Sequence, residues 1–145
     1  MITSNLHYRI HFFKEAARKA NLRRGQIKIM DVDNIITING RIKAVLEFKE
    51  RANKVTLYAI PEFEWIVLKN MAETFNADLI LLFFDFHADK YWLCHYKAGE
   101  IPFKQPKYTQ KGWFVFFGKG EGKYMTMKEL LNYFAKLFNQ WKRCC

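Results

Sequence analysis

The chain has 145 residues, of which 50% are hydrophobic and 17% aromatic, and this composition excludes a disordered protein. Its 24 lysines and arginines exceed its 14 aspartates and glutamates, and the formal net charge of +10 suits a polyanionic partner, although a merely basic soluble protein has the same balance. Without a long apolar run, a signal peptide or zinc-spaced cysteines, the sequence predicts one intracellular, cytoplasmic domain over residues 1–145, with no membrane segment and no disulfide framework.

The first predicted element is a helix that Ser4 or Asn5 can cap and that ends near Asn21. Arg23 and Arg24 follow its last turn, where cations favour the negative end of the helix dipole. The alternative is that these two arginines contact a DNA backbone.

A β-hairpin follows, and it holds the most informative residues of the chain. Asn39-Gly40 joins two β-branched apolar runs, which is the strongest short-range hairpin signal. Asp33 lies upstream and Glu47-x-Lys49 lies at the far end, so strand pairing brings two carboxylates and a lysine together. Carboxylates bind Mg²⁺ that also holds a phosphate, and an ammonium group can accept a proton from water or stabilise charge at phosphorus. The hairpin therefore predicts a metal site suited to phosphodiester cleavage.

The register of this hairpin can be tested by parity, because side chains alternate between the two faces of a strand. A two-residue turn pairs Ile38 with Arg41 and turns Glu47 away from the face of Asp33, which counts against the metal site. A three-residue turn, with Gly40 as a left-handed bulge, brings the carboxylates to one face with the pairs Thr37–Arg41, Asp33–Val45 and Asp31–Glu47. We therefore predict a bulge at Gly40 or a bend near Asp33. The alternative is a solvent-facing pair of Glu47 and Lys49 on an edge strand.

The next segments predict a βαβ unit. Pro61 suits the start of a second helix, whose expected buried stripe is Phe63, Ile66, Val67, Met71 and Phe75. Residues 79–86 form a nearly unbroken apolar run, as in a central strand that is buried on both faces and parallel to strand 43–49. Residues 91–96 predict an antiparallel neighbour. The fold class is therefore α/β, with a central mixed sheet of about five strands flanked by helices.

Residues 99–112 hold Lys104, Lys107 and Lys111 between aromatic residues and prolines. Lysines can meet phosphates while an aromatic ring stacks on an unpaired base, so this is the loop most suited to nucleic acid. The alternative is an ordered surface loop. Residues 113–117 predict a strand, and the glycines of residues 118–122 lack the spacing of a P-loop, so no nucleotide cofactor is expected.

A last helix begins at the capping box formed by Thr126 and Glu129. Its large apolar stripe comprises Leu130, Phe134, Leu137, Phe138 and Trp141. Core packing explains such a stripe, and a homodimer interface is the alternative.

The order of Asp33, the Asn39-Gly40 turn and Glu47-x-Lys49 resembles the PD-(D/E)XK nucleases, and in a small basic chain it is most similar to the archaeal Holliday junction resolvases. The resemblance covers roughly residues 5–96. It implies a restriction-endonuclease-like αβββαβ core, a homodimer, and hydrolysis of DNA phosphodiesters with Mg²⁺ or Mn²⁺. It implies that Asp33 and Glu47 bind the metal with help from the Phe48 carbonyl, that Lys49 is catalytic, and that Asp31 is the substitute ligand.

The chain departs from the resolvase pattern in its first helix, where those proteins commonly have an early glutamate. Residues 6–10 contain no acid, and Glu15 is the nearest later candidate for the metal site. The residues expected to contact DNA are Arg23, Arg24, Arg51, Lys69, Lys104, Lys107 and Lys111. The residues fit a nuclease for single-stranded or flap DNA as well as a junction resolvase. A catalytically inactive DNA-binding protein and a protein-interaction domain are the rival classes.

Overall fold

The computed structural model describes residues 18–21, 34–51 and 57–143 of the chain. The chain divides into two compact units, Met1–Asp31 and Val32–Cys145. In the first unit, the described residues are the end of a helix, where the Asn21 N–H donates to the Arg18 carbonyl at 3.0 Å and Asn21 has a φ of 58°. The predicted helix end near Asn21 agrees with this turn.

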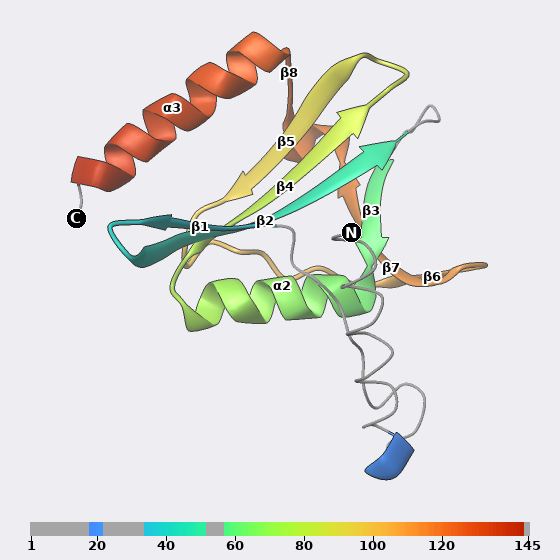
Figure 1. Cartoon of the computed structure of the whole chain (residues 1–145). Coiled ribbons are helices and arrows are strands. Elements are labelled where there is room, and N and C mark those ends of the chain that lie inside the picture. Colours follow the sequence, from blue (N-terminus) through green and yellow to red (C-terminus); the bar gives the residue numbers. More distant parts are fainter. Residues whose placement is uncertain (1–17, 22–33, 52–56, 144–145) are drawn as a thin grey trace. The chain divides into compact units, whose positions relative to one another are not determined.

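The second unit is built on a five-stranded sheet with the order β1-β2-β4-β5-β8 (Figure 1). Strands β2 and β4 are parallel, and the other neighbouring pairs are antiparallel, so the sheet is mixed as predicted. The strands are β1 (Asn34–Ile38), β2 (Arg41–Arg51), β4 (Asp78–Asp85), β5 (Lys90–Tyr96) and β8 (Lys123–Met125).

A second, three-stranded antiparallel sheet has the order β3-β7-β6, with β3 (Leu57–Pro61), β6 (Lys107–Thr109) and β7 (Gly112–Gly118). The sequence predicts the strand at β7 but not this separate sheet. The remaining elements are the helices α2 (Glu62–Thr74) and α3 (Met127–Arg143) and the short 3₁₀ helix η1 (Lys119–Glu121). The α/β class and the mixed sheet flanked by helices are therefore confirmed.

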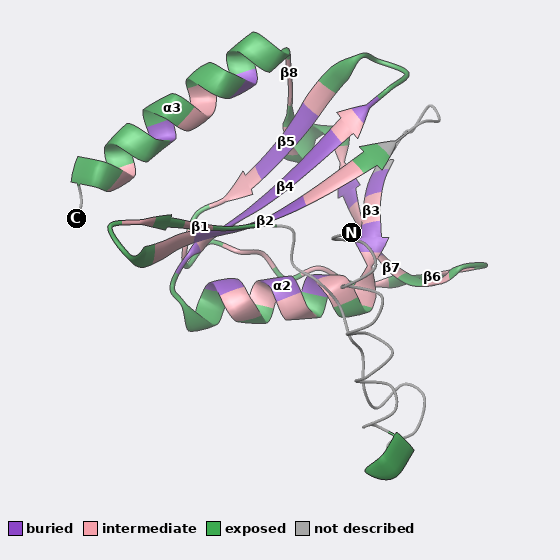
Figure 2. Ribbon diagram, viewed as in Figure 1, coloured by how far each residue is buried: buried purple, intermediate pink, exposed green. Residues whose placement is uncertain are grey.

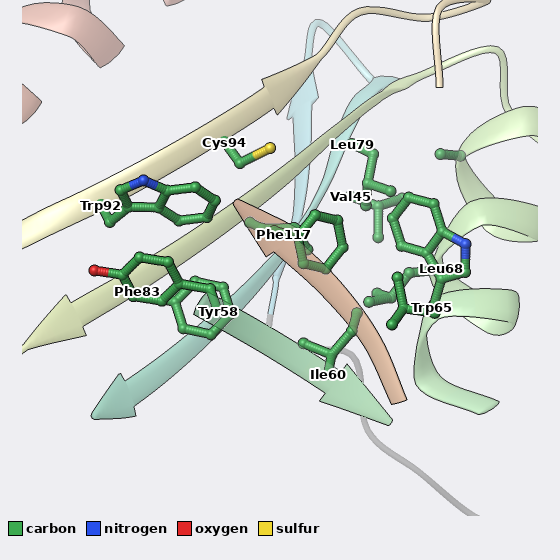
Figure 3. Packing of buried hydrophobic residues seen from close by; sticks show 13 residues of the cluster. Val45, Tyr58, Ile60, Trp65, Leu68, Leu79, Phe83, Trp92, Cys94 and Phe117 are labelled. Atoms are coloured by element: carbon green, nitrogen blue, oxygen red, sulfur yellow. The ribbon is translucent and has the colours of Figure 1, made fainter. Parts of the chain in front are cut away.

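Both faces of the five-stranded sheet are covered, which explains the unbroken apolar run of β4. Alternate residues of β4, such as Leu79 and Phe83, pack with α2 and the second sheet in one core (Figure 3). The intervening residues Ile80 and Leu82 pack with Leu130 and Leu137 of α3 in the other. Side chains alternate along a strand, so a strand between two cores needs apolar residues at every position. Figure 2 shows β4 as the most continuously buried strand.

Aromatic side chains dominate the core between the two sheets. Tyr58 stacks on Trp92 with ring centroids 4.2 Å apart, and Trp65 of α2 meets Phe117 edge-on at 5.4 Å. The buried Tyr58 hydroxyl lies within hydrogen-bond distance of the Tyr124 hydroxyl, at 2.8 Å, and of the Asp85 carboxylate, at 3.3 Å, and burial raises the pKa of Tyr58. The phenol is therefore held neutral where an ionised oxygen would lack water.

The buried face of α2 differs from the predicted stripe. Its buried residues are Trp65, Leu68 and Ala72, whereas Phe63, Ile66 and Phe75 are 41%, 48% and 45% exposed. Both sets have helical spacing, and the sequence alone does not tell which set faces the sheet. The face that holds Trp65 is buried because β3 and β7 cover it.

The start of α3 is the predicted capping box. The Thr126 hydroxyl accepts the Glu129 N–H at 3.2 Å, and the Glu129 carboxylate accepts the Thr126 N–H at 3.0 Å. Farther along, the Tyr133 hydroxyl lies 2.5 Å from Nδ1 of His95, whose Nε2 lies 2.7 Å from Asp78, so a polar chain ties α3 to β5 and β4. Within the ranges given above, no helix is long and apolar enough to cross a membrane.

Candidate functional site

The turn of the β1–β2 hairpin differs from the predicted bulge. Ile38 pairs with Arg41, and Asn39 and Gly40 have φ values of 52° and 78°, so the turn has two residues in the left-handed region. The prediction of a bulge at Gly40 is wrong. The reason is that Asn and Gly both tolerate positive φ, which the two-residue turn between right-handed twisted strands requires. The alternative prediction, a bend near Asp33, lies outside the described residues.

A bulge nevertheless lies farther along the hairpin. Thr37 pairs with Ile42, but Ile36 pairs with Ala44, so Lys43 is the extra residue on β2. From there Val45 lies opposite Ile35, not opposite Asp33 as predicted. The bulge shifts the pairing by one residue. The side chains of β2 beyond Lys43 therefore lie on the opposite face, relative to β1, from the one that a two-residue turn alone would give them.

Glu47 and Lys49 share the face of β2 that also carries Val45. Strand β2 lies between β1 and β4, and in β4 the partners of Glu47 and Lys49 are Leu81 and Phe83. Glu47 is only 4% exposed. A solvent-facing pair on an edge strand is therefore wrong for these residues. A carboxylate buried in an interior strand is costly unless charge or hydrogen bonding compensates it, and Lys49 supplies charge at 3.5 Å, from Nζ to the Glu47 Oε1.

Glu64 of α2 completes this cluster. The Lys49 ammonium donates to Glu64 Oε1 at 2.9 Å and to Oε2 at 3.2 Å, with the Glu64 side chain 13% exposed. One ammonium group thus lies within ion-pair distance of two carboxylates from different elements, β2 and α2. We refer to Glu47, Lys49 and Glu64 as the E-K-E cluster.

Sequence reasoning missed Glu64, which was not among the residues predicted for the site. A signal was present, because Glu64 lies one position before Trp65 and four before Leu68, at the border of the stripe that is in fact buried. A carboxylate at the border of a buried stripe needs a nearby cation to compensate its charge. Because the prediction placed the buried stripe on another face of α2, it did not indicate that Glu64 would need such a partner.

The predicted metal ligands are only partly within the described residues. Asp31, Asp33 and Glu15 lie outside them. Among the described residues, no three His, Cys, Asp or Glu side chains form a group that could hold a metal ion. The Glu47 carboxylate is an oxygen donor of the kind Mg²⁺ takes, whereas both oxygens of Glu64 accept hydrogen bonds from Lys49, so a metal site here needs further acids from outside the described residues.

The structure separates the lysines predicted to contact DNA into two kinds. Lys69 lies 3.8 Å from Glu73 and 5.9 Å from the Phe103 ring centroid, and Lys104 forms an ion pair with Glu121 and lies 4.8 Å from the Phe117 ring centroid. Those two are engaged within the fold. Lys107 and Lys111 are exposed at the β6–β7 hairpin. Arg23 and Arg24 lie outside the described residues, as does the side chain of Arg51.

The Lys104–Glu121 pair is part of a network that fixes the end of β7. Burial of Glu121 acts to raise the pKa of its carboxyl, but hydrogen bonds from Lys104 and from the Gly118 N–H, at 2.8 Å for the latter, outweigh burial and lower the pKa. Tyr96 also donates to Glu121, at 3.1 Å. Lys104 is thus better explained by the stability of this corner than by DNA contact.

Comparison with models of protein families, with curated proteins and with solved structures gave no match to this chain. The resemblance to the PD-(D/E)XK nucleases therefore depends on the sequence pattern alone.

Proposed function

We propose that this protein is an intracellular, metal-dependent deoxyribonuclease of the PD-(D/E)XK type, which hydrolyses phosphodiester bonds of DNA, with branched DNA such as a Holliday junction as a candidate substrate. The observation that carries the proposal is the Glu47-x-Lys49 pair. Both side chains lie on one face of an interior strand, 3.5 Å apart, and Glu47 is nearly fully buried. Enzymes place charged groups in such enclosed positions at a stability cost when chemistry requires them.

Asp33 and Glu47 would hold Mg²⁺ or Mn²⁺ together with the Phe48 carbonyl. This assignment requires the register of Asn34 opposite Leu46 to continue by one residue, which would bring Asp33 opposite Glu47. When bound, the metal would polarise the scissile phosphate and lower the pKa of an attacking water.

Lys49 would stabilise the negative charge that develops on the phosphoryl oxygens or orient the attacking water. Glu64 accepts two hydrogen bonds from the same ammonium group and so fixes its position. We assign Glu64 a positioning role, because it touches Lys49 rather than a reacting atom.

A second candidate function is DNA binding without cleavage. Its support is that Lys49 lies closer to Glu64 than to Glu47, at 2.9 Å against 3.5 Å, so the E-K-E cluster also explains how β2 is tied to α2. A purely structural ion cluster needs no metal and no reaction.

Cleavage of labelled duplex, single-stranded, flap and four-way-junction DNA with Mg²⁺, Mn²⁺ or chelator tests the proposal. Glu47→Gln and Lys49→Met should each lower the cleavage rate by roughly 10²- to 10⁴-fold while binding in chelator is retained. Glu73→Gln, on the same helix as Glu64 and exposed, should leave cleavage unchanged.

The same cleavage and binding measurements separate the two candidates. Binding without cutting in any metal would favour the inactive DNA-binding protein. Cutting that survives both substitutions in the E-K-E cluster would contradict the assigned site.

We further propose that the protein is a homodimer joined through α3. Its exposed residues Met127, Leu131 and Phe138 are 53%, 63% and 38% exposed. With the half-buried Phe134 and Trp141, they recur at intervals of four and three residues, the spacing of a helix–helix seam. A two-fold dimer would present two cleavage sites to one DNA molecule.

A further inference from the structure

The β6–β7 hairpin exposes two large aromatic side chains. Tyr108 and Trp113 are paired in register across the hairpin, with ring centroids 5.3 Å apart and a T-shaped angle of 67°. Tyr108 is 70% exposed and Trp113 is 53% exposed. Figure 2 shows β6 largely in the exposed colour, at the free end of the second sheet.

The position of Trp113 on β7 shows why it is exposed. Side chains alternate along a strand, so Trp113 lies on the same face as Val115 and Phe117, which are fully buried in the core. The core-facing side of β7 therefore extends, at the hairpin, past the elements that cover it. A fold that needed only to close its core would end the strand sooner or place a polar residue at this position.

Hydrogen bonds within the turn fix the conformation of the hairpin. Thr109 pairs with Gly112, and its hydroxyl donates to the Gly112 carbonyl at 2.9 Å and accepts the Lys111 N–H at 3.1 Å. The aromatic pair is therefore presented in one geometry, which lowers the entropy lost when a ligand binds.

The charge around the pair favours a polyanion. Lys107 and Lys111 are exposed on the hairpin, and residues 107–113 contain no acid. Lys111 and Trp113 also line an open cavity of about 300 Å³ with Phe63, which is 41% exposed. Glu62 lines the same cavity and is its one acidic lining residue.

We infer that the β6–β7 hairpin binds unpaired bases of a DNA substrate by stacking them on Trp113 and Tyr108, while Lys107 and Lys111 contact the phosphates. This inference rests on the proposed function and narrows its substrate to DNA with a single-stranded part, such as a flap or an open junction. Stacking is suited to this task because every base has a π face, whereas the bases of a continuous duplex are already stacked.

The test is equilibrium binding in chelator, so that it does not depend on cleavage. The probes are a single-stranded oligonucleotide, the same strand with abasic sites, and the corresponding duplex. Wild type should bind the strand with bases more tightly than the abasic strand. Trp113→Ala should bind the strand with bases roughly 10- to 100-fold more weakly than wild type does, and its affinity for the abasic strand should change little. Phe86→Ala, which removes an aromatic residue of similar exposure just after β4 and outside residues 99–113, is the matched control.

A second readout uses the fluorescence of Trp113. Two of the four tryptophans, Trp65 and Trp92, are buried and out of reach of a bound base. Quenching of the tryptophan fluorescence by the strand with bases should therefore be mostly lost in Trp113→Phe, which keeps an aromatic ring. Lys107→Ala and Lys111→Ala should instead weaken binding to both strands and reduce its salt dependence.

The inference is overturned if Trp113→Ala and Tyr108→Ala bind all three probes as wild type does. It is also overturned if these variants lose affinity for anionic lipid vesicles but not for DNA. If the protein binds the strand with bases preferentially but never cleaves DNA, this inference stands and the proposed nuclease activity is contradicted. If wild type and the hairpin variants cleave DNA equally well, the nuclease activity stands and this inference is contradicted.

Discussion

Because of the Cys94 thiol, we expect the stability of the protein to change with pH in the alkaline range. Cys94 is fully buried on β5, and burial raises its pKa from 9.0 to about 11, although a hydrogen bond with Tyr96 opposes this. A group with a raised pKa in the folded state stabilises it below the unfolded pKa, and this stabilisation is lost as the pH rises toward the folded pKa. Stability should therefore fall above pH 9.

The contribution of Cys94 can be isolated with the Cys94→Ala variant. The free energy of unfolding of wild type minus that of the variant should decrease by about 1 kcal/mol between pH 8 and pH 10. Urea unfolding at these pH values measures it. Other titrating groups act in both proteins and largely cancel, and the cavity left by the substitution adds a constant offset. A difference that is constant with pH would mean that the folded protein does not shield this thiol.

At the residue scale, the sequence predicted two of the three residues of the E-K-E cluster. Glu47 and Lys49 were identified because their spacing on a strand is visible in the chain. Glu64 was not, because its partner is fixed by how α2 lies against β2, and the apolar pattern of α2 allows two faces. Asp33 remains a prediction.

The segment between η1 and β8 depends on one glycine. A Cβ at Gly122 would lie 2.5 Å from the Trp92 ring and 2.6 Å from the Leu93 carbonyl. Trp92 cannot yield easily, because it is fully buried and its indole N–H donates to the Lys119 carbonyl at 3.1 Å. Gly122→Ala should therefore destabilise the protein by about 1–3 kcal/mol through overpacking.

Gly120 provides a matched control in the same turn. A Cβ there would meet no atom within 4 Å, and its backbone has no positive φ, so Gly120→Ala should change the midpoint of thermal unfolding little. Differential scanning calorimetry of both variants measures the contrast. Equal melting temperatures for the two variants would contradict the close approach of Gly122 to Trp92.

At the element scale, local signals were reliable and non-local ones were not. The α3 capping box and the strand at β4 were confirmed, since each is specified within a few residues. The bulge at Lys43 was not anticipated, because the apolar pattern of the hairpin does not indicate where along the strand an extra residue falls. The pairing of β3 with β7 joins Leu57 to Gly118, and no short-range pattern indicates such a distant partner.

At the scale of the whole molecule, α3 has more apolar surface than the sheet buries. Leu130 and Leu137 face the sheet, whereas Met127, Leu131 and Phe138 remain substantially exposed. Exposed apolar residues in a continuous stripe mark an interface in soluble proteins. Two copies of α3 pairing through this stripe would bury it and leave the contacts of Leu130 and Leu137 intact.

Sedimentation velocity over a range of protein concentrations tests this dimer. Wild type should sediment as a dimer, and Leu131→Glu should sediment as a monomer, because a two-fold contact would bring the introduced charges of both copies into one apolar seam. Its melting temperature should match that of a wild-type monomer obtained by dilution, since Leu131 is 63% exposed and does not hold α3 to the sheet. Lys136→Glu is the control, because Lys136 is exposed outside the stripe. A wild type that stays monomeric at the highest concentration would remove the dimer, and each DNA strand would then require a separate binding event.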